Sequence, residues 1–308
     1  MATSQPNDPE QTDDPNLDQP PRPSPLGVLP ILDEEDENDG DDPAEDDDFE
    51  GDEVDEGPRT VLITGANGNI GRKLRAAWEE RYDLVLIDRA AVDDDPDVVA
   101  ADLSIIDDDW MALFQGVDTV VHLAGNPNEN ATWEELVGPN IDALSHVFQA
   151  AALAGVERIV FASSNHAMGG YRTLGDIPIT VELPPRPGNS YGATKLMGER
   201  IGESLAGIFD LSFVALRIGW VQVGANRPDT LPDEWGKELW LSDPDMIHLF
   251  DRAVEADLGD RNFVVVNGMS KNHGSRWDLT GSFESIGFSP ADDAFESEKA
   301  HPGPHSLG

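Results

Sequence analysis

A strand, a glycine-rich turn and a helix follow one another without a gap, and this order constrains the fold more than any other feature of the sequence. The apolar run TVLITG (60–65) predicts a buried strand, and NIGRKLRAAWEERY (69–82) predicts a helix. Gly65 suits a tight turn, Gly68 lets the backbone approach a bound diphosphate, and Gly71 lets helix and strand pack closely. The order therefore predicts a dinucleotide phosphate site at a helix N-terminus, with an ordinary glycine-rich turn as the alternative interpretation.

Short apolar runs alternate with helical patterns along the rest of the chain. We expect further strands at 84–88, 98–101, 119–124, 158–164, 211–218 and 263–267, and helices at 107–114, 131–154, 191–205 and 244–256. Alternation of this kind is typical of α/β folds. The sequence therefore predicts a Rossmann-type, doubly wound parallel sheet.

Composition divides the chain into four parts. Residues 1–58 are rich in Pro, Asp and Glu and poor in aromatic residues, so we expect a disordered acidic tail there. We expect residues 59–218 to form a cofactor-binding Rossmann domain and residues 219–295 a small substrate-binding cap. Residues 296–308 are expected to be a disordered C-terminal tail.

The chain is strongly acidic, with a formal net charge of -41 and a pI of about 4.1. Such a charge repels phosphate, so we expect neither nucleic acid nor a membrane surface as a partner. An acidic, lysine-poor surface is typical of halophilic proteins, in which molar salt screens self-repulsion; an acidic protein of an ordinary cytoplasm is the alternative. No secretion signal and no apolar run of membrane-spanning length are found, so we expect a cytoplasmic protein. The sequence has no cysteine, which excludes a thiolate metal site, and we expect no metal.

The residues at the end of the second predicted strand indicate whether NAD or NADP binds. Asp88 lies there, where a carboxylate accepts hydrogen bonds from ribose hydroxyls and repels the 2′-phosphate of NADP. Arg89 would instead attract that phosphate, so NAD is the favoured cofactor and NADP the alternative. Asp102 and Leu103 follow the third strand and would flank the adenine, although an exposed Asp is unremarkable in an acidic protein. Further expected cofactor contacts come from the glycine-rich turn: Gly65, Asn67, Gly68, Asn69, Ile70 and Gly71.

Tyr191 and Lys195 lie one turn apart at the start of a predicted helix, so both side chains leave the same helix face. Ser163 and Ser164 end the preceding strand, and parallel strands bring their carboxyl ends to the cofactor crevice. Lys195 and the positive nicotinamide ring would lower the pKa of the Tyr191 phenol, making it the base, while Ser164 would hydrogen-bond the reacting oxygen. A Tyr and a Lys that merely pack on a helix surface are the alternative.

Taken together, four motifs resemble the short-chain dehydrogenase/reductase superfamily in its extended, NAD-dependent epimerase/dehydratase branch. They are TGANGNIG (64–71), VVHLAG (120–125), the serine-ended strand (158–164) and YGATK (191–195). The segment from Ile286 to Pro290 is similar to the C-terminal signature of that branch. The resemblance covers roughly residues 60–290 and implies an NAD(P)-dependent oxidoreductase that acts on CH–OH groups.

The resemblance also implies roles for single residues. Ser164 corresponds to the catalytic serine because Gly169 follows it at the interval typical of the family. Asn140 corresponds to the helix asparagine that orders the Lys195 end of a proton relay. The end of the strand at 119–124 and the residues after it would contact the cofactor through Leu123, Ala124 and Gly125, and the substrate through Asn126.

Within the branch, FASSNHAMGGY (161–171) and WLSDPDMIHLF (240–250) are most similar to uronate dehydrogenases and to NAD-dependent glucose-6-phosphate dehydrogenases of halophilic archaea. Those enzymes oxidise a sugar ring at C1 to a lactone. By this resemblance Asn165 and His166 would touch a small-molecule sugar substrate, although a loop histidine satisfied by the backbone is the alternative for His166.

The segment after residue 217 departs from the uronate enzymes. Trp220 stands where a small polar contact to the sugar is expected. Three residues are candidates for pairing an anionic group of the sugar: Arg227, Lys237 and Arg252. Arg227 is the one we include among the expected substrate residues.

We also expect a homodimer, formed through the helices at 131–154 and 191–205.

Two other functions remain open. A nucleotide-sugar epimerase is the first alternative, although it usually needs a larger C-terminal domain than residues 219–308 provide. A 4,6-dehydratase is not one of the two, because it would carry Asp-Glu where Asn165 and His166 stand.

A non-catalytic NAD(P)-binding regulator is the second alternative. Loss of the Tyr191 and Lys195 pair would be expected in such a protein, but both residues are present.

Overall fold

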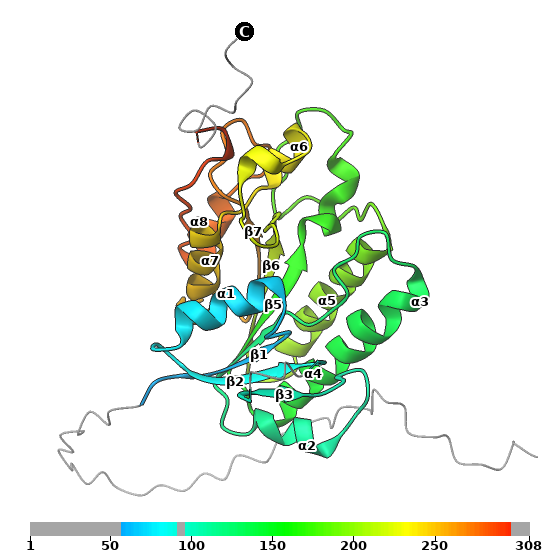
Figure 1. The fold of residues 1–308 in the computed structure, drawn as a ribbon, viewed down its shortest axis with the longest axis vertical. Coiled ribbons are helices and arrows are strands. Elements are labelled where there is room, and N and C mark those ends of the chain that lie inside the picture. The colour runs from blue at the N-terminus through cyan, green and yellow to red at the C-terminus, as the bar shows by residue number, and fades with distance from the viewer. Residues whose placement is uncertain (1–56, 91–95, 297–308) are drawn as a thin grey trace, which may run out of the picture. The chain divides into compact units, whose positions relative to one another are not determined.

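The computed structural model describes residues 57–90 and 96–296. Within them, seven strands form one sheet in the order β3-β2-β1-β4-β5-β6-β7, and all neighbours pair in parallel (Figure 1). The strands are β1 Thr60–Thr64, β2 Asp83–Asp88, β3 Val98–Ala100, β4 Thr119–His122, β5 Arg158–Ser164, β6 Ser212–Ile218 and β7 Phe263–Gly268. The predicted Rossmann-type, doubly wound sheet is confirmed. The predicted tails at 1–58 and 296–308 lie outside the described residues, apart from residues 57, 58 and 296.

Helices cover both faces of this sheet (Figure 1). The α-helices are α1 Asn69–Trp78, α2 Asp108–Met111, α3 Trp133–Leu136, α4 Ala143–Leu153, α5 Ser190–Ala206, α6 Glu234–Leu239, α7 Asp243–Glu255 and α8 Thr280–Ile286. Four further helical segments are η1 Ala112–Phe114, η2 Val137–Asp142, η3 Asn165–Tyr171 and η4 Pro228–Thr230. Two short segments, α2 and η1, together occupy the range predicted as one helix at 107–114.

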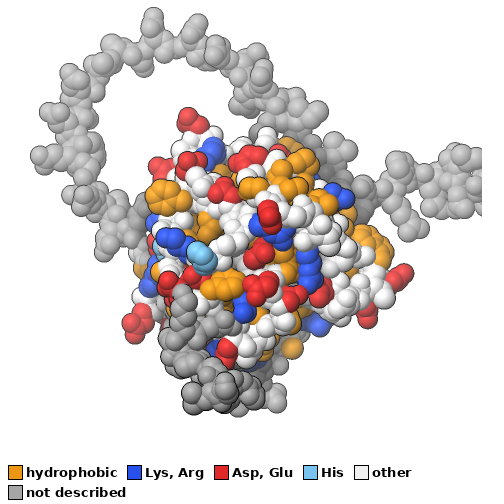
Figure 2. Space-filling model, turned by 90° about the horizontal axis from the view of Figure 1, so that it is seen from above, with side chains coloured by type: hydrophobic (Ala, Val, Ile, Leu, Met, Phe, Trp, Pro, Cys, Tyr) orange, Lys and Arg blue, Asp and Glu red, His pale blue; other side chains and the backbone are white. Residues whose placement is uncertain are grey.

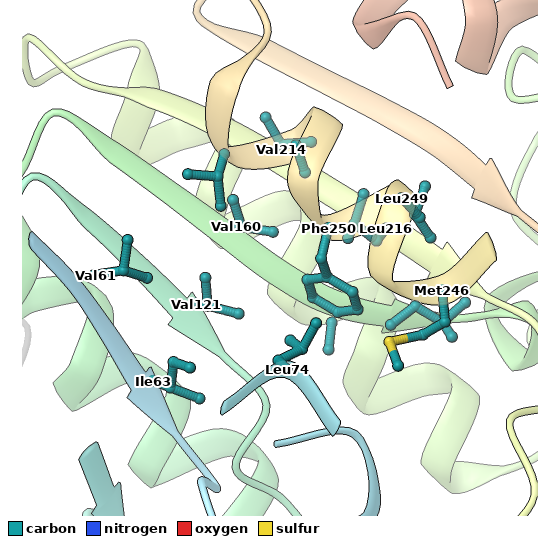
Figure 3. Packing of buried hydrophobic residues seen from close by; sticks show 14 of the residues in the cluster. Val61, Ile63, Leu74, Val121, Val160, Val214, Leu216, Met246, Leu249 and Phe250 are labelled. Carbon is teal, nitrogen blue, oxygen red and sulfur yellow. The ribbon is translucent and has the colours of Figure 1, made fainter. Parts of the chain in front are cut away.

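Alternate strand residues point to opposite faces, so the sheet separates two hydrophobic clusters. In β1, Val61 and Ile63 join the first cluster and Leu62 joins the second. Figure 3 shows the first, in which strand residues meet Leu74 of α1 and Phe250 of α7. The second cluster lies under α4 and α5 and contains the packed rings of Phe148, Phe161 and Phe213.

The C-terminal part of the chain contributes to the sheet as well as to the region above it. Strand β7 pairs with β6 from Phe213↔Phe263 to Ile218↔Gly268, and α7 packs in the first cluster. The range 219–295, predicted as a cap, therefore also supplies an edge strand and a covering helix. Of its other helical segments, α6 lies beyond the carboxyl ends of β5 and β6 (Figure 1).

The helix predicted over 131–154 consists of α3, the π-helical segment η2 and α4. Thr132 and Glu135 form a capping box that fixes its start. Pro139 lies inside η2; it has no N–H to donate, and its ring would clash with the carbonyl of a regular α-helical turn. The wider π turn accommodates the proline, and such turns are frequent at functional sites. Asn140, which follows it, is buried.

The surface of the described part combines charged and apolar side chains. On the face in Figure 2, acidic and basic groups are intermingled with hydrophobic ones. Leu153 of α4 and Met197 of α5 are among the exposed large apolar residues. No helix within residues 57–90 and 96–296 is both long and apolar enough to cross a membrane.

Helix α5 packs unusually close to the sheet because two of its glycines face phenylalanine rings. A Cβ atom on Gly198 would lie 2.5 Å from the ring of Phe161, and one on Gly202 would lie 2.2 Å from the ring of Phe213. Any side chain at these positions would push the helix away from β5 and β6. The two glycines therefore set the height of α5 above the sheet.

Between these glycines, a buried ion pair ties α5 to the sheet. Both carboxylate oxygens of Glu199 accept hydrogen bonds from Arg217 of β6, from Nε at 2.9 Å and from Nη2 at 2.8 Å. The hydroxyl of Ser163 on β5 donates to the same carboxylate at 2.6 Å. All three side chains are buried. A shift of α5 along the sheet would separate the pair and leave uncompensated buried charges, so the pair opposes such a shift.

Glu199→Gln is expected to lower the free energy of unfolding by about 3 kcal/mol or more, because Arg217 would keep a buried charge without its counter-ion. Glu203→Gln is the matched control: Glu203 lies one turn later on α5 and forms an exposed pair with Arg200 at 2.6 Å. We expect that control to change stability by no more than about 0.5 kcal/mol. Urea unfolding in molar KCl measures both. Equal losses in the two variants would contradict a special role for the buried pair.

Candidate active site

A cleft of about 1620 Å³ opens at the carboxyl ends of the parallel strands. It brings together nearly every site residue predicted from the sequence. These are Gly65, Asn67, Gly68, Asn69, Ile70, Gly71, Asp88, Arg89, Asp102, Leu103, Leu123, Ala124, Gly125, Asn126, Ser164, Asn165, His166, Tyr191 and Lys195. Asn140 and Arg227 are the two predicted site residues that do not line it.

The glycine-rich turn has the geometry that a diphosphate requires. Gly65 has a φ of 73°, which favours glycine, and a Cβ on Gly71 would lie 2.4 Å from the carbonyl oxygen of Gly65. The first turn of α1 contains no acidic residue, and no side chain caps it. Its N–H groups are therefore available to an anion, and the positive end of the helix dipole favours one. These features fit the pyrophosphate of a dinucleotide.

The side chains at the ends of β2 and β3 fit the adenosine half. Asp88 is positioned by the backbone N–H of Asn67, which donates to its Oδ2 at 2.9 Å. Arg89 is exposed beside it. Hydrogen bonds from the side chain and backbone of Ser104 lower the pKa of Asp102, so this carboxylate is held in a local turn. Leu103 is buried next to it.

Tyr191 and Lys195 meet at the floor of the cleft. Asn189 caps α5 by accepting a hydrogen bond from the N–H of Gly192 at 2.8 Å. The Nζ of Lys195 lies 5.1 Å from the ring centroid of Phe161 and 5.7 Å from that of Tyr191. Burial raises the pKa of Tyr191 to about 12, although a hydrogen bond with Ser164 acts to lower it. Burial also lowers the pKa of Lys195 to about 8.

His122 lies at the end of β4, beside Phe161 in the second hydrophobic cluster. It is fully buried, stacks on the ring of Phe161 and hydrogen-bonds the Thr64 hydroxyl through Nδ1 at 2.8 Å. Burial, together with the charge of Lys195, lowers the pKa of His122 to about 3. The histidine is therefore neutral at physiological pH, and it adds no charge that would oppose protonation of Lys195.

The segment after β5 presents three predicted residues to the cleft. Ser164 accepts a hydrogen bond from the N–H of His166 at 3.2 Å. Asn165 donates to the carbonyl of Ile218 at 3.0 Å, so its amide nitrogen ties β5 to β6. The His166 ring lies edge-on to Tyr191 with centroids 5.5 Å apart, and its Nδ1 lies 3.1 Å from Nδ2 of Asn189.

Asn140 lies behind the cleft wall rather than in it. Its Oδ1 accepts from the N–H of Asn126 at 2.7 Å, and its Nδ2 donates to the carbonyl of Asn126 and to the hydroxyl of Thr194. The last of these hydrogen bonds joins Asn140 to Thr194, the neighbour of Lys195 in sequence, whereas the expected role concerned the Lys195 end of a proton relay. The π-helical segment thus holds the loop that carries Asn126 through hydrogen bonds to the Asn126 backbone.

The cations expected to meet an anionic sugar lie elsewhere. Arg227 is exposed and forms an ion pair with Asp229. Arg252 donates to the carbonyl of Ile286, and the Nζ of Lys237 lies 5.4 Å from the Phe295 ring centroid. None of the three lines the cleft. Arg172, which the sequence did not single out, lines it instead.

Several other cleft residues were not found from the sequence: Glu129, Arg172, Asn189, Asp233 and Trp235. Asn189 carried a usable signal, because Asn directly before a helical pattern is a preferred N-cap. The others come from loops and from a short helix whose placement depends on contacts distant in sequence. Among the described residues, no group of three or more His, Cys, Asp or Glu could hold a metal ion.

Two hydrogen bonds connect the glycine-rich turn to the chain segment after β6. The Asn69 amide donates to the carbonyl of Val221 at 3.1 Å and to that of Gln222 at 3.3 Å. Lys73, one turn along α1, forms an ion pair with Asp243 at 2.6 Å. Helix α1 and the segment that follows β6 are therefore held together beside the cleft, which Asn69 and Val221 line.

Comparison with known proteins agrees with this geometry. The "NAD-dependent glucose-6-phosphate dehydrogenase" of Haloferax volcanii is 35% identical over 77% of this chain and 94% of its own length. The "L-arabinose 1-dehydrogenase (NAD(P)(+))" of the same organism is 33% identical over 76% of this chain and 97% of its own length. The crystal structure of uronate dehydrogenase from Agrobacterium tumefaciens superposes with a TM-score of 0.67 and 30% identity, covering 79% of this chain and 88% of that one.

The sequence profile of a single family spans the strands and loops that build the cleft. It matches residues 61–233, from β1 to the residue before α6. The resemblance inferred from the four sequence motifs is therefore confirmed. This chain belongs to the NAD dependent epimerase/dehydratase family.

Proposed function

We propose that this protein oxidises a free or phosphorylated sugar, or a uronate, at C1 to a lactone, with NAD as the hydride acceptor. The observation that carries the proposal is the meeting of Ser164, Tyr191 and Lys195 at the floor of a cleft that also contains a dinucleotide-type glycine turn. The relatives support a sugar as the substrate, because the two from Haloferax volcanii and the uronate dehydrogenase are all sugar dehydrogenases by name.

In the proposed mechanism, Tyr191 takes the proton of the anomeric hydroxyl while the C1 hydrogen leaves with its electron pair. When bound, NAD supplies the acceptor for that hydride. The C1–O bond becomes the carbonyl of the lactone, and Ser164 donates a hydrogen bond to this oxygen as the charge develops. Because burial holds the pKa of Tyr191 near 12, proton removal requires a stabilising positive charge. Lys195 provides it, with its Nζ 5.7 Å from the phenol ring.

We further propose that the protein acts as a cytoplasmic homodimer, assembled through α4 and α5. Leu153 and Met197 support this choice of interface, because both are large apolar residues exposed on those helices. Light scattering of the protein in molar KCl measures the oligomeric state.

Tyr191→Phe is expected to lower kcat about 10²- to 10⁴-fold, because the variant lacks the proton acceptor but keeps nearly the same shape. NAD binding, measured by calorimetry, should be retained. Tyr171→Phe is the control: the Tyr171 hydroxyl donates to the carbonyl of Pro184 outside the catalytic group. The assay follows NADH formation with a panel of free sugars, sugar phosphates and uronates in molar KCl. Near-normal turnover in Tyr191→Phe, or conversion of a nucleotide-linked sugar with no NADH from any free sugar, would refute the proposal.

Asp88→Asn is expected to lower kcat/KM for NAD about tenfold and to raise it for NADP, because the amide no longer repels a 2′-phosphate. The amide oxygen of the variant can still accept the Asn67 N–H, so the turn should keep its shape. Asp83→Asn, at the exposed opposite end of β2, controls for the loss of one negative charge. A wild-type enzyme that uses NADP better than NAD would show the assignment to be wrong.

A further inference from the structure

Beyond Tyr191 and His166, the cleft is bounded by Arg172, Trp220, Asp233 and Trp235, which we call the distal wall. Arg172 directly follows η3, Trp220 comes soon after β6, and Asp233 and Trp235 are at the start of α6. Asp233 and Trp235 place this part of the cleft lining at α6, and α6 lies apart from α1 and the glycine-rich turn that precedes it (Figure 1). The non-reacting part of a substrate held at Tyr191 would therefore face the distal wall.

The guanidinium of Arg172 in the distal wall already forms an ion pair with Asp233. Nη2 of Arg172 lies 2.6 Å from Oδ2 of Asp233. The other carboxylate oxygen, Oδ1, accepts the N–H of Gly236 at 2.8 Å and caps α6. Arg172 also lies over the ring of Trp235, with its Cζ 5.9 Å from the ring centroid. Helix capping orients the carboxylate, and both the carboxylate and the indole lie against the guanidinium, although the Arg172 and Asp233 side chains are about half exposed.

The remaining ionisable groups at this end of the cleft make it more acidic. The carboxylate of Glu129 lies 3.2 Å from Nε2 of His166. Burial lowers the pKa of His166, and the charge of Arg172 acts in the same direction while Glu129 opposes it, so the ring is neutral at physiological pH. Among the described residues that line the cleft, the other cations are Arg72 and Arg89 near the cofactor turn and Lys195 beneath the tyrosine. Two carboxylates thus face one guanidinium at the distal end.

The same wall offers apolar surface. Trp220 is 41% exposed and lines the cleft together with Val223, which is 84% exposed. Trp235 is a second indole of the wall, but Arg172 and Arg276 lie over its ring, with their Cζ atoms 5.9 and 5.0 Å from the ring centroid, so Trp220 is the indole that presents exposed surface. Indole faces pack against the C–H face of a sugar ring, while carboxylates accept hydrogen bonds from its hydroxyls. Neither feature helps to bind a phosphate or a carboxylate.

Building on the proposed function, we infer that the substrate is a neutral aldose, without phosphate or carboxylate, whose ring packs on the distal wall. An anionic sugar at Arg172 would have to share the guanidinium with Asp233, whose carboxylate already balances its charge. The anion would then lie beside that carboxylate, and Glu129 would repel it as well. A neutral pyranose meets no such repulsion, because its hydroxyls can donate hydrogen bonds to these carboxylates.

The test compares kcat/KM for NADH formation with neutral aldoses, L-arabinose, D-xylose, D-glucose and D-galactose, against glucose 6-phosphate and glucuronate at one ionic strength. We expect the best neutral aldose to exceed both anionic sugars about tenfold or more. Calorimetry with the Tyr191→Phe variant and NAD should show the same order for binding alone. A higher kcat/KM for an anionic sugar than for every neutral one overturns the inference but leaves the proposed function standing. No NADH from any sugar overturns the proposed function itself.

Asp233→Asn tests the wall directly. Asparagine also caps helices, so α6 should remain folded while the guanidinium of Arg172 loses its counter-ion. We expect kcat/KM for glucose 6-phosphate, relative to the best neutral aldose, to rise about tenfold. Asp229→Asn is the control, because it removes one charge from the Arg227–Asp229 pair outside the cleft. An unchanged ratio in Asp233→Asn, or an equal rise in both variants, would contradict the part assigned to the Arg172–Asp233 pair.

Discussion

The close packing of α5 against β5 and β6 positions the two residues around which the cleft is organised. Gly198 and Gly202 allow the phenylalanine rings of the sheet to reach the helix backbone, and Glu199 joins Arg217 and Ser163 between them. Tyr191 and Lys195 belong to the same helix, about two turns and one turn before Glu199, respectively. A shift of α5 would move both functional groups together, away from Ser164 at the end of β5. The buried pair of Glu199 and Arg217 opposes such a shift, because separating the two side chains would leave buried charges uncompensated.

The electrostatics of the site differ from those of the chain as a whole. The protein has a formal net charge of -41, yet the ammonium of Lys195 contacts aromatic rings at the cleft floor and burial lowers its pKa to about 8. An acidic partner would hold the lysine pKa high and neutralise its effect on the phenol. The neutral surroundings, including His122 with its lowered pKa, leave the lysine charge to act on Tyr191.

The sequence predicts well those parts of the site that are determined locally. The turn from Gly65 to Gly71 and the helix face with Tyr191 and Lys195 depend on neighbouring residues, so spacing alone indicates them. Arg227 was expected at the substrate because a positive group of the predicted cap could pair an anionic sugar, but it pairs with Asp229 two residues away. Arg172 pairs with Asp233, which is 61 residues away, and no local pattern reveals that contact. Likewise, β7 is recognisable as a strand, but only pairing with β6 places it in the main sheet.

The bonds from Asn69 to the carbonyls of Val221 and Gln222 connect the diphosphate turn with the chain that leads from Trp220. Lys73 and Asp243 reinforce the same junction. The cofactor turn and the segment after Trp220 are therefore not separate modules that could be exchanged independently between relatives. A redesign of the cofactor turn that removes the Asn69 amide would loosen the segment next to Trp220, a residue of the wall proposed to contact the sugar. Conversely, a graft of a foreign loop at 221–223 would need carbonyls in the same places to keep helix α1 in position.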